Sequence, residues 1–295
     1  MSHNKNNNNM ENLEKLKIKD LLIKYCDGYT SQNKAANSLK DVSSATISQI
    51  RNGNWALIND KMWLNIGKQV GYDGLDWIDA VTHNYELINK MLCDAKEKSR
   101  CHAIIGAAGW GKDTGQRGFK IGRKHVYQVN CDGTMTIRCL LIEILEALGE
   151  VPAGTPYKMA KRIVSIMNGI DAPVLILNEY EKLQKKPFMY FITLYNLLEN
   201  KCGIVLFGTP ELEARIIRTD NTGTYVRQGC GEIYSRIGSR FIHLVRPDLS
   251  DIAAICEANG VYDANDISEI FNSSGGDQRR VKKLVQNKAK GDKAA

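Results

Sequence analysis

The sequence predicts an α/β protein with a parallel sheet, preceded by an all-helical segment and followed by a helical lid. Three observations support this prediction. Short, fully apolar runs such as Val174–Leu177 are typical of strands buried on both faces. A glycine-rich loop directly follows one such run. Before and after this central region, apolar residues recur at three- and four-residue spacing, which indicates helices.

The composition narrows the class of protein. The chain has 295 residues, is 43% hydrophobic and carries a formal net charge of +7. This apolar content excludes disorder throughout, and the apolar runs are far shorter than the roughly 18 residues of a membrane helix. The Asn-rich start has no secretory signal, so we expect a cytoplasmic protein. The eight scattered cysteines contain no C-x-x-C pair and are expected to be reduced core thiols.

The distribution of charge limits how the chain could bind nucleic acid. Residues 11–90 hold ten basic and ten acidic side chains, whereas the last 17 residues hold seven basic side chains and one acid. Nucleic-acid binding would therefore depend on local patches or on this basic end. The basic end is interpreted as a DNA contact, a partner docking site or a merely solvated terminus.

Residues 11–72, after an expected disordered tail over 1–10, predict a helix-turn-helix domain. Short helices are expected over 31–39 and 44–53, with a turn between them. The small Ala35 and Ala36 would let these helices approach. Polar side chains on the second helix could reach bases and phosphates, and the candidates for DNA contact are Ser44, Thr46, Gln49 and Arg51. The alternative, favoured by the neutral charge, is a helical bundle used only for protein contacts.

This stretch resembles the helix-turn-helix of the phage repressor class over Gln32–Gly53. It departs from that pattern at Lys40, where glycine is usual, and its turn is one residue longer. A helical connector is expected over residues 73–100.

The central region, residues 101–247, is the predicted nucleotide-binding core. A strand over 101–106 leads into the loop Gly106–Lys112, and a helix is expected over 116–124. Glycines let backbone N–H groups point inward around an anion, and the following helix adds its dipole. The residues expected to contact the nucleotide here are Gly106, Ala107, Ala108, Gly109, Trp110, Gly111, Lys112, Asp113 and Thr114.

Two positions beside this loop depart from the usual pattern together. Asp113 stands where Ser or Thr normally follows the lysine, with Thr114 next, and the strand over 172–179 ends in Asn178-Glu179 instead of Asp-Glu. Glu179 is in place to activate a water molecule, whereas Asn178 brings no charge. Either the carboxylate has moved across the site and Mg²⁺ still binds through Asp113, Thr114 and Asn178, or the site turns nucleotide over poorly. Introduced substitutions are a third interpretation.

Further polar residues follow later strands. Thr209 ends the strand over 203–209 and could touch a terminal phosphate or the attacking water. Arg236 and Arg240 precede the last strand, over 241–245, and are interpreted as arginine fingers for a neighbouring subunit or as surface ion pairs. A helical lid is expected over 248–290, before a short tail over 291–295. Arg279 opens its last helix and could project back to the nucleotide.

From about His102 to Gln286 the chain resembles the AAA+ ATPase superfamily. The resemblance rests on the order of five elements: Walker A (Gly106–Lys112), Walker B (Val174–Glu179), sensor 1 (Thr209), the arginine-finger region and sensor 2 (Arg279). With the N-terminal helix-turn-helix, the chain is similar to the transposition ATPases of the phage Mu B, TnsC and IstB group. The resemblance implies a bacterial, phage or mobile-element protein that binds ATP and Mg²⁺, oligomerises on duplex DNA as a filament or ring, selects target DNA and recruits a transposase.

In such an assembly a few basic residues per subunit would suffice for avid, sequence-tolerant DNA binding. The candidates in the core are Lys158, Lys161, Arg162, Lys182, Lys185 and Lys186. Two other functions stay open at this point. One is a DNA-binding regulator that only senses nucleotide, and the other is a replication-initiator or helicase-loader ATPase.

Overall fold

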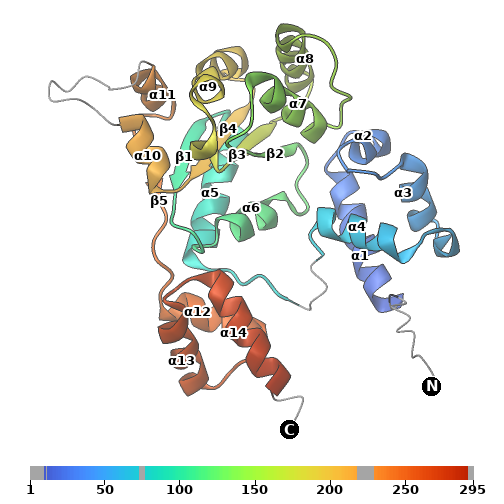
Figure 1. The fold of residues 1–295 in the computed structure, drawn as a ribbon, viewed down its shortest axis with the longest axis vertical. Helices are drawn as coiled ribbons and strands as arrows, with labels where there is room; N and C mark the ends of the chain where they lie inside the picture. Colours follow the sequence, from blue (N-terminus) through green and yellow to red (C-terminus); the bar gives the residue numbers. More distant parts are fainter. Residues whose placement is uncertain (1–9, 11, 73–76, 218–228, 292–295) are drawn as a thin grey trace.

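The computed structural model describes residues 10, 12–72, 77–217 and 229–291 (Figure 1). A five-stranded parallel sheet lies at its centre, in the order β2-β3-β4-β1-β5. The strands are β1 (Cys101–Ile105), β2 (Val126–Asn130), β3 (Val174–Asn178), β4 (Gly203–Gly208) and β5 (Ile242–His243). The predicted α/β fold with a parallel sheet is confirmed. All the residues of β1, β3 and β4 are buried, as their continuous apolar runs require.

Helices cover both faces of the sheet. One face packs against α5 (His83–Lys98) and α6 (Lys112–Lys120) through residues such as Ile88, Leu92 and Phe119. The other packs mainly against α7 (Ile137–Ala147), α8 (Pro156–Asn168) and α9 (Lys185–Leu198). The short helices η2 (Tyr180–Lys182), α10 (Pro210–Ile217) and α11 (Cys230–Arg236) complete this side. The core is therefore a three-layer α/β/α arrangement.

Two expected helices of this region have different limits. The helix after the glycine-rich loop begins at Lys112 instead of Gln116, because Gly111 with φ 83° caps it, and it ends at Lys120, before Gly122 with φ 74°. Among the described residues of the connector expected to be helical over 73–100, the helix covers His83–Lys98. Residues 77–82 are not helical, and Thr82 caps α5 by accepting a hydrogen bond from the Tyr85 N–H. Residues 73–76 and Arg218, the expected end of α10, lie outside the described residues.

The N-terminal helical segment, residues 12–70, contains α1 (Asn12–Asp27), α2 (Gln32–Asn37), α3 (Ser44–Arg51), η1 (Trp55–Leu57) and α4 (Asp60–Val70). Ser31 and Ser43 cap α2 and α3 through their side chains. A small apolar core lies between these two helices, and all its members are buried: Ala35, Ala36, Leu39, Val42, Ile47 and Ile50. Helices α1 and α4 add the fully buried Ile18, Leu22 and Trp63 to it.

The lid consists of α12 (Leu249–Ala258), α13 (Ala264–Ser274) and α14 (Gln278–Gly291). Helix α14 ends at Gly291, one residue beyond the lid expected over 248–290. Lys288 forms ion pairs with Asp266 and Glu269 of α13, so this part of the basic end belongs to the lid and is not a solvated terminus. The tails expected over 1–10 and 291–295 lie almost entirely outside the described residues.

The N-terminal helical segment is docked on the core at the turn after α7. The Tyr29 hydroxyl donates to the Ala147 carbonyl at 3.1 Å, Asn37 donates to the Gly149 carbonyl at 3.2 Å, and Lys34 pairs with Glu150 at 3.1 Å. A Cβ built on Gly149 would lie 2.2 Å from the Lys34 carbonyl oxygen, and Gly149 also has φ 74°. Only glycine allows this close approach of the two backbones.

Two general features complete the description. All eight cysteines are free thiols, and six are buried, but Cys139 is exposed, which corrects the expectation of a core thiol at that position. Within the described ranges, no helix is long and apolar enough to cross a membrane, and no group of three or more His, Cys, Asp and Glu side chains could hold a metal ion.

The start of β1 is tied to α5 by one carboxylate, which leads to a stability prediction. Asp94 accepts hydrogen bonds from Lys98 at 2.8 Å, Arg100 at 3.1 Å and His102 at 2.8 Å, and these bonds, that from Lys98 first, lower the pKa of Asp94 to about 2. We expect Asp94→Asn to lower the free energy of unfolding by about 2 kcal/mol at pH 7.

The folded pKa of Asp94 lies below its usual value of 3.8, so its contribution is present above that pH and is lost as the pH falls toward 2. Denaturant unfolding at a series of pH values checks this, because the difference between wild type and variant should shrink below pH 4. The control is Asp20→Asn, at an exposed position on α1, which should change stability by less than about 0.5 kcal/mol. An equal effect of both variants at pH 7 would contradict the prediction.

Candidate nucleotide-binding site

The glycine-rich loop between β1 and α6 forms the centre of the site. Gly109 and Gly111 have φ 79° and 83°, which only glycine adopts without strain. A Cβ on Gly106 would lie 2.8 Å from the Leu244 side chain, so this glycine is needed where the loop leaves the sheet. The loop thus wraps around the N-terminus of α6, whose unpaired N–H groups and dipole favour an anion.

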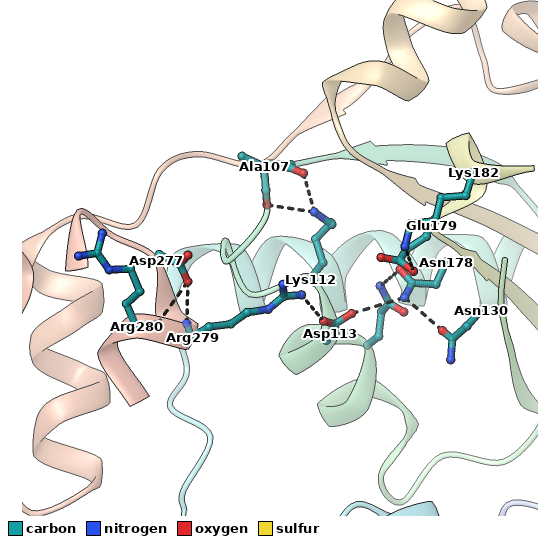
Figure 2. A network of polar contacts seen from close by, with 12 residues as sticks. Ala107, Lys112, Asp113, Asn130, Asn178, Glu179, Lys182, Asp277, Arg279 and Arg280 are labelled. Atoms are coloured by element: carbon teal, nitrogen blue, oxygen red, sulfur yellow. Dashed lines mark hydrogen bonds and ion pairs between the residues drawn. The ribbon is translucent and has the colours of Figure 1, made fainter. Parts of the chain in front are cut away.

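Lys112 is half-buried at the start of α6. Its ammonium group donates to the carbonyl oxygens of Gly106 at 2.5 Å and Ala107 at 3.0 Å (Figure 2). Burial lowers the pKa of Lys112, and the neighbouring Asp113 carboxylate opposes this effect. The lysine therefore lies folded over the loop, with its charge incompletely compensated by carbonyl dipoles, and a phosphate would supply the missing counter-charge.

A network of amides and carboxylates links the loop helix to the end of β3. The Asn178 amide group donates to Asp113 at 3.4 Å and to Asn130 at 3.2 Å, while its oxygen accepts a hydrogen bond from Gln116 at 3.0 Å (Figure 2). Asn178 is 6% exposed, whereas the Asp113 side chain is 57% exposed. The carboxylate of this network, Asp113, is exposed and offers oxygen atoms to a hard cation.

Asn178 is held between two elements. Its oxygen accepts a hydrogen bond from Gln116 and its NH₂ group donates to the Asp113 carboxylate, so Asn178 orients that carboxylate. Asp113 and Thr114 are the remaining oxygen donors of the expected metal set, and both line the cavity described below.

Glu179 lies at the end of β3, in a left-handed conformation with φ 55°. Its carboxylate is 42% exposed and forms an ion pair with Lys182 at 2.8 Å. Lys182 was expected to contact DNA, but here it faces Glu179. Glu179 and Asp113 line one cavity of about 530 Å³ together with Asn130, Asn178, Gln128, Arg117 and Lys68.

Glu181 is a further acidic residue of the site that the sequence motifs did not indicate. Its Oε1 accepts a hydrogen bond from the Thr209 N–H at 3.1 Å, while Oε2 and the Thr209 hydroxyl are buried without a partner among the described residues. The Glu181 carboxylate raises the pKa of Lys112, although less than burial lowers it. The pair Glu181–Thr209 thus holds two buried polar atoms that have no partner among the described residues.

The lid closes the other side of the site. The Gln278 N–H donates to the Gly109 carbonyl at 2.9 Å. Arg279 pairs with Asp113 at 3.3 Å (Figure 2). Between lid and loop lies a cavity of about 210 Å³, lined by residues 109 and 111–114 of the loop and helix α6, Trp77 and Ala80 of the connector, and Ile255, Gln278, Arg279 and Lys282 of the lid. Arg279 therefore reaches the site as expected, through a carboxylate.

The remaining loop residues predicted to contact nucleotide have different surroundings. Ala107 offers its carbonyl to Lys112. The Trp110 carbonyl accepts a hydrogen bond from Asn84 at 3.1 Å, and the indole packs in the core beneath the sheet. Ala108 is exposed. The predicted site residues that the structure brings together are thus Lys112, Asp113, Asn178, Glu179, Thr209 and Arg279.

Arg236 ends α11, and Arg240 lies two residues before β5, the edge strand farthest from β2. No polar contact recorded among the described residues joins either one to the loop. Arg236 pairs with Glu232 at 3.2 Å and stacks on Tyr195. Arg240 is exposed, and the structure records no ion pair for it among the described residues. Of the two, only Arg240 is available for a neighbouring subunit without breaking an ion pair.

Several candidates for DNA contact are used within the chain. Ser44 accepts hydrogen bonds from Gln32, and Arg51 lies 3.8 Å from Asp27. Arg162 pairs with Glu150 and donates to the Val151 carbonyl. These residues hold helices in place. The other candidates, Thr46, Gln49, Lys158, Lys161, Lys185 and Lys186, have no ion pair among the described residues, and Lys158, Lys161, Lys185 and Lys186 are exposed or extend along the surface of α8 and α9.

Comparisons with known proteins show what part of this chain is similar to. Residues 95–216 match the family model of the AAA domain, and no curated protein matches the sequence. The RuvB Holliday junction branch migration motor of Thermotoga maritima has a similar structure, with 13% identity and a TM-score of 0.43 over 72% of this chain and 63% of that one. NtrX from Brucella abortus, solved in complex with ATP, shows 14% identity and a TM-score of 0.45 over 84% of this chain and 59% of that one.

The present chain therefore spans less than two thirds of the length of either structure. The family match covers a segment that contains β1, the glycine-rich loop, β3 and β4. The parallel sheet order 2-3-4-1-5 and the loop geometry around Lys112 agree with this similarity to the AAA domain of P-loop proteins.

Proposed function

We propose that this chain binds ATP with Mg²⁺ between its loop and lid, hydrolyses it, and uses the bound nucleotide to assemble on duplex DNA as a transposition protein that recruits a transposase. The observation that carries the ATPase part is the Asp113 carboxylate, which lies 3.4 Å from the Asn178 amide at the mouth of the loop. The end of β3 has Asn178 in place of the usual Asp, and the carboxylate of Asp113 on the first turn of α6 lies beside it.

The residues present fit a Mg²⁺–ATP complex. Backbone N–H groups of the loop and the Lys112 ammonium would bind the phosphates, and the oxygens of Asp113 and Thr114 would hold the cation. Mg²⁺, when bound, neutralises charge on the phosphates. Arg279 pairs with Asp113 at 3.3 Å in this structure, and on nucleotide binding it would leave this carboxylate and pair with a phosphate. Lys112 would likewise leave the carbonyls of Gly106 and Ala107 and pair with a phosphate.

Glu179 is the candidate general base. Its carboxylate forms an ion pair with Lys182 at 2.8 Å, and a general base must be free to accept a proton from water. Breaking this pair would free Glu179 to accept a proton from water. The same contact favours a second candidate function, in which the chain is a nucleotide-sensing DNA-binding regulator and Glu179 stays paired with Lys182.

The DNA and transposase parts of the proposal rest on the resemblance to the Mu B, TnsC and IstB group. They are supported by the exposed Lys158, Lys185 and Lys186, and by Arg240, which is free to reach a neighbouring subunit. A replication-initiator or helicase-loader function predicts a site-specific footprint instead. Electron microscopy with duplex DNA and ATP, ADP or no nucleotide distinguishes these: the proposal requires filaments or rings that depend on ATP and tolerate any DNA sequence.

Glu179→Gln tests the ATPase part directly. We expect phosphate release to fall about 100-fold or more, because the variant cannot accept a proton, while ATP affinity stays within about threefold. Lys182→Gln is the matched control, since it frees Glu179 and should not reduce turnover. The regulator would be favoured by one result: the wild type releases phosphate no faster than Glu179→Gln, with or without DNA and at every Mg²⁺ concentration.

A further inference from the structure

A further cavity lies between the N-terminal helical segment and the α/β core, and we refer to it as the interface cleft. It has a volume of about 190 Å³. Five basic side chains line it: Lys24 and Lys68 from α1 and α4, and Arg117, Lys120 and Arg123 from α6 and the turn after it. Figure 1 shows α1 and α4 on the side of the sheet where α6 and β2 lie.

The basic side chains of the cleft have little counter-charge. No Asp or Glu is among its lining residues, and within the described part of the chain only Arg117 has an acidic partner, Asp79 at 2.7 Å. Lys120 lies over the Tyr25 ring at 5.0 Å, and Arg123 lies over the Phe119 ring at 4.4 Å. Because like charges repel, gathering them in a cavity is unfavourable unless an anion is bound among them.

The remaining lining restricts the kind of anion. Tyr25, Leu21 and Ile121 give the cleft an apolar and aromatic wall, and Gln69 and Gln128 add amides. Its volume is close to the 210 Å³ of the cavity beside the glycine-rich loop. A duplex is far too wide to enter such a space, whereas a ring with one or more phosphates fits both its size and its mixed lining.

The two walls of the cleft are held in place before any ligand binds. The His125 N–H donates to the Gly28 carbonyl at 3.2 Å, and the rings of Tyr29 and Tyr127 meet edge to face at 6.3 Å. Together with the contacts at Gly149, these fix α1 against β2. A ligand would therefore bind a preformed site and would not lose free energy in assembling it.

We propose that the interface cleft is a second anion site, which binds a small phosphorylated ligand with an aromatic or apolar part, such as a mononucleotide. This goes beyond the proposed function, because Lys112 and its loop do not line the cleft. The cleft shares Lys68, Arg117 and Gln128 with the cavity of Asp113 and Glu179. Its occupant thus lies next to the first site and would affect nucleotide binding there.

Equilibrium dialysis of the full chain with radiolabelled ATP, ADP, AMP and pyrophosphate tests the proposal. We expect the wild type to bind two equivalents of at least one of these ligands, and Lys112→Ala to retain one. In the Lys112→Ala background, adding Lys24→Gln and Lys120→Gln should weaken the remaining binding by roughly 100-fold, about tenfold for each cation removed. Both lysines line the cleft and not the cavity of Glu179.

The matched control is Lys61→Gln with Lys124→Gln, which removes two exposed lysines near the same elements but outside the cleft. This control should bind as the Lys112→Ala parent does. A single equivalent that Lys112→Ala abolishes would overturn the second site while leaving the proposed function intact. Equal losses in both pairs of variants, or binding of short single-stranded DNA but of no small ligand, would also overturn it.

Discussion

Replacing Asp113 with threonine is expected to lower the rate of ATP hydrolysis about 100-fold, and a second change, Asn178→Asp, is expected to restore most of it. The reason is the position of the single carboxylate. Asp113 lies 3.4 Å from the Asn178 amide. The double variant therefore moves the carboxylate only to the residue that is hydrogen-bonded to it. The double variant has the more usual arrangement of the same groups.

The other variants of this cycle separate charge from shape. Asp113→Asn keeps the size of the side chain but not its charge, and should be as inactive as Asp113→Thr. Asn178→Asp alone puts two carboxylates in contact, so it should unfold at a lower temperature without Mg²⁺ and regain stability when Mg²⁺ is added. Steady-state kinetics over a range of Mg²⁺ concentrations checks all of them. Wild-type hydrolysis by Asp113→Asn would show that this carboxylate is not used.

Gly109→Ala is expected to weaken ATP binding about 10- to 100-fold without unfolding the chain. Gly109 has φ 79°, and its new Cβ would lie 2.3 Å from the Asp277 carboxylate. Asp277 cannot easily turn away, because it caps α14 by accepting hydrogen bonds from the Arg279 and Arg280 N–H groups. The lid would therefore move off the loop and open the cavity that we propose for ATP.

Gly122→Ala is the control for backbone strain, since Gly122 has φ 74° but nothing lies within 4 Å of its added Cβ. Gly122→Ala should lower the free energy of unfolding by about 1 kcal/mol, the cost of placing alanine in a left-handed conformation, and should keep its ATP affinity. Asp277→Ala removes the atoms that clash and should recover part of the affinity of Gly109→Ala. Fluorescent-nucleotide titration measures all of these, and equal affinities for Gly109→Ala and Gly122→Ala would contradict the explanation.

Local patterns were sufficient to predict the α/β fold and the buried strands. Continuous apolar runs such as Val174–Leu177 indicate strands, and the glycines at 109 and 111 indicate a phosphate loop, because both features depend on neighbouring residues only. The start of α6 was misplaced by four residues. A helix that begins inside a glycine-rich loop has no polar side-chain cap to mark it, and Gly111 replaces one through its φ of 83°.

The parts of the site that sequence reasoning missed depend on contacts between distant elements. The hydrogen bond between Asp113 and Asn178 joins residues 65 positions apart. Glu181 resembles any surface acid of a polar turn, and only the fold shows that it accepts a hydrogen bond from Thr209. Similarly, Lys182 lies one turn from Glu179 and forms an ion pair with it. From the sequence alone, a lysine in such a pair looks the same as a lysine that contacts DNA.

The close approach at Gly149 has a practical consequence for any attempt to isolate the ATPase part of the chain. A shortened chain that begins at His83 would leave the carbonyls of Ala147 and Gly149 without their donors, Tyr29 and Asn37, and Glu150 without Lys34. It would also uncover the ring of Tyr127. Such a fragment would expose a surface that is buried in the full chain and would be prone to aggregate. Loss of ATP hydrolysis in the fragment would therefore reveal nothing about catalysis.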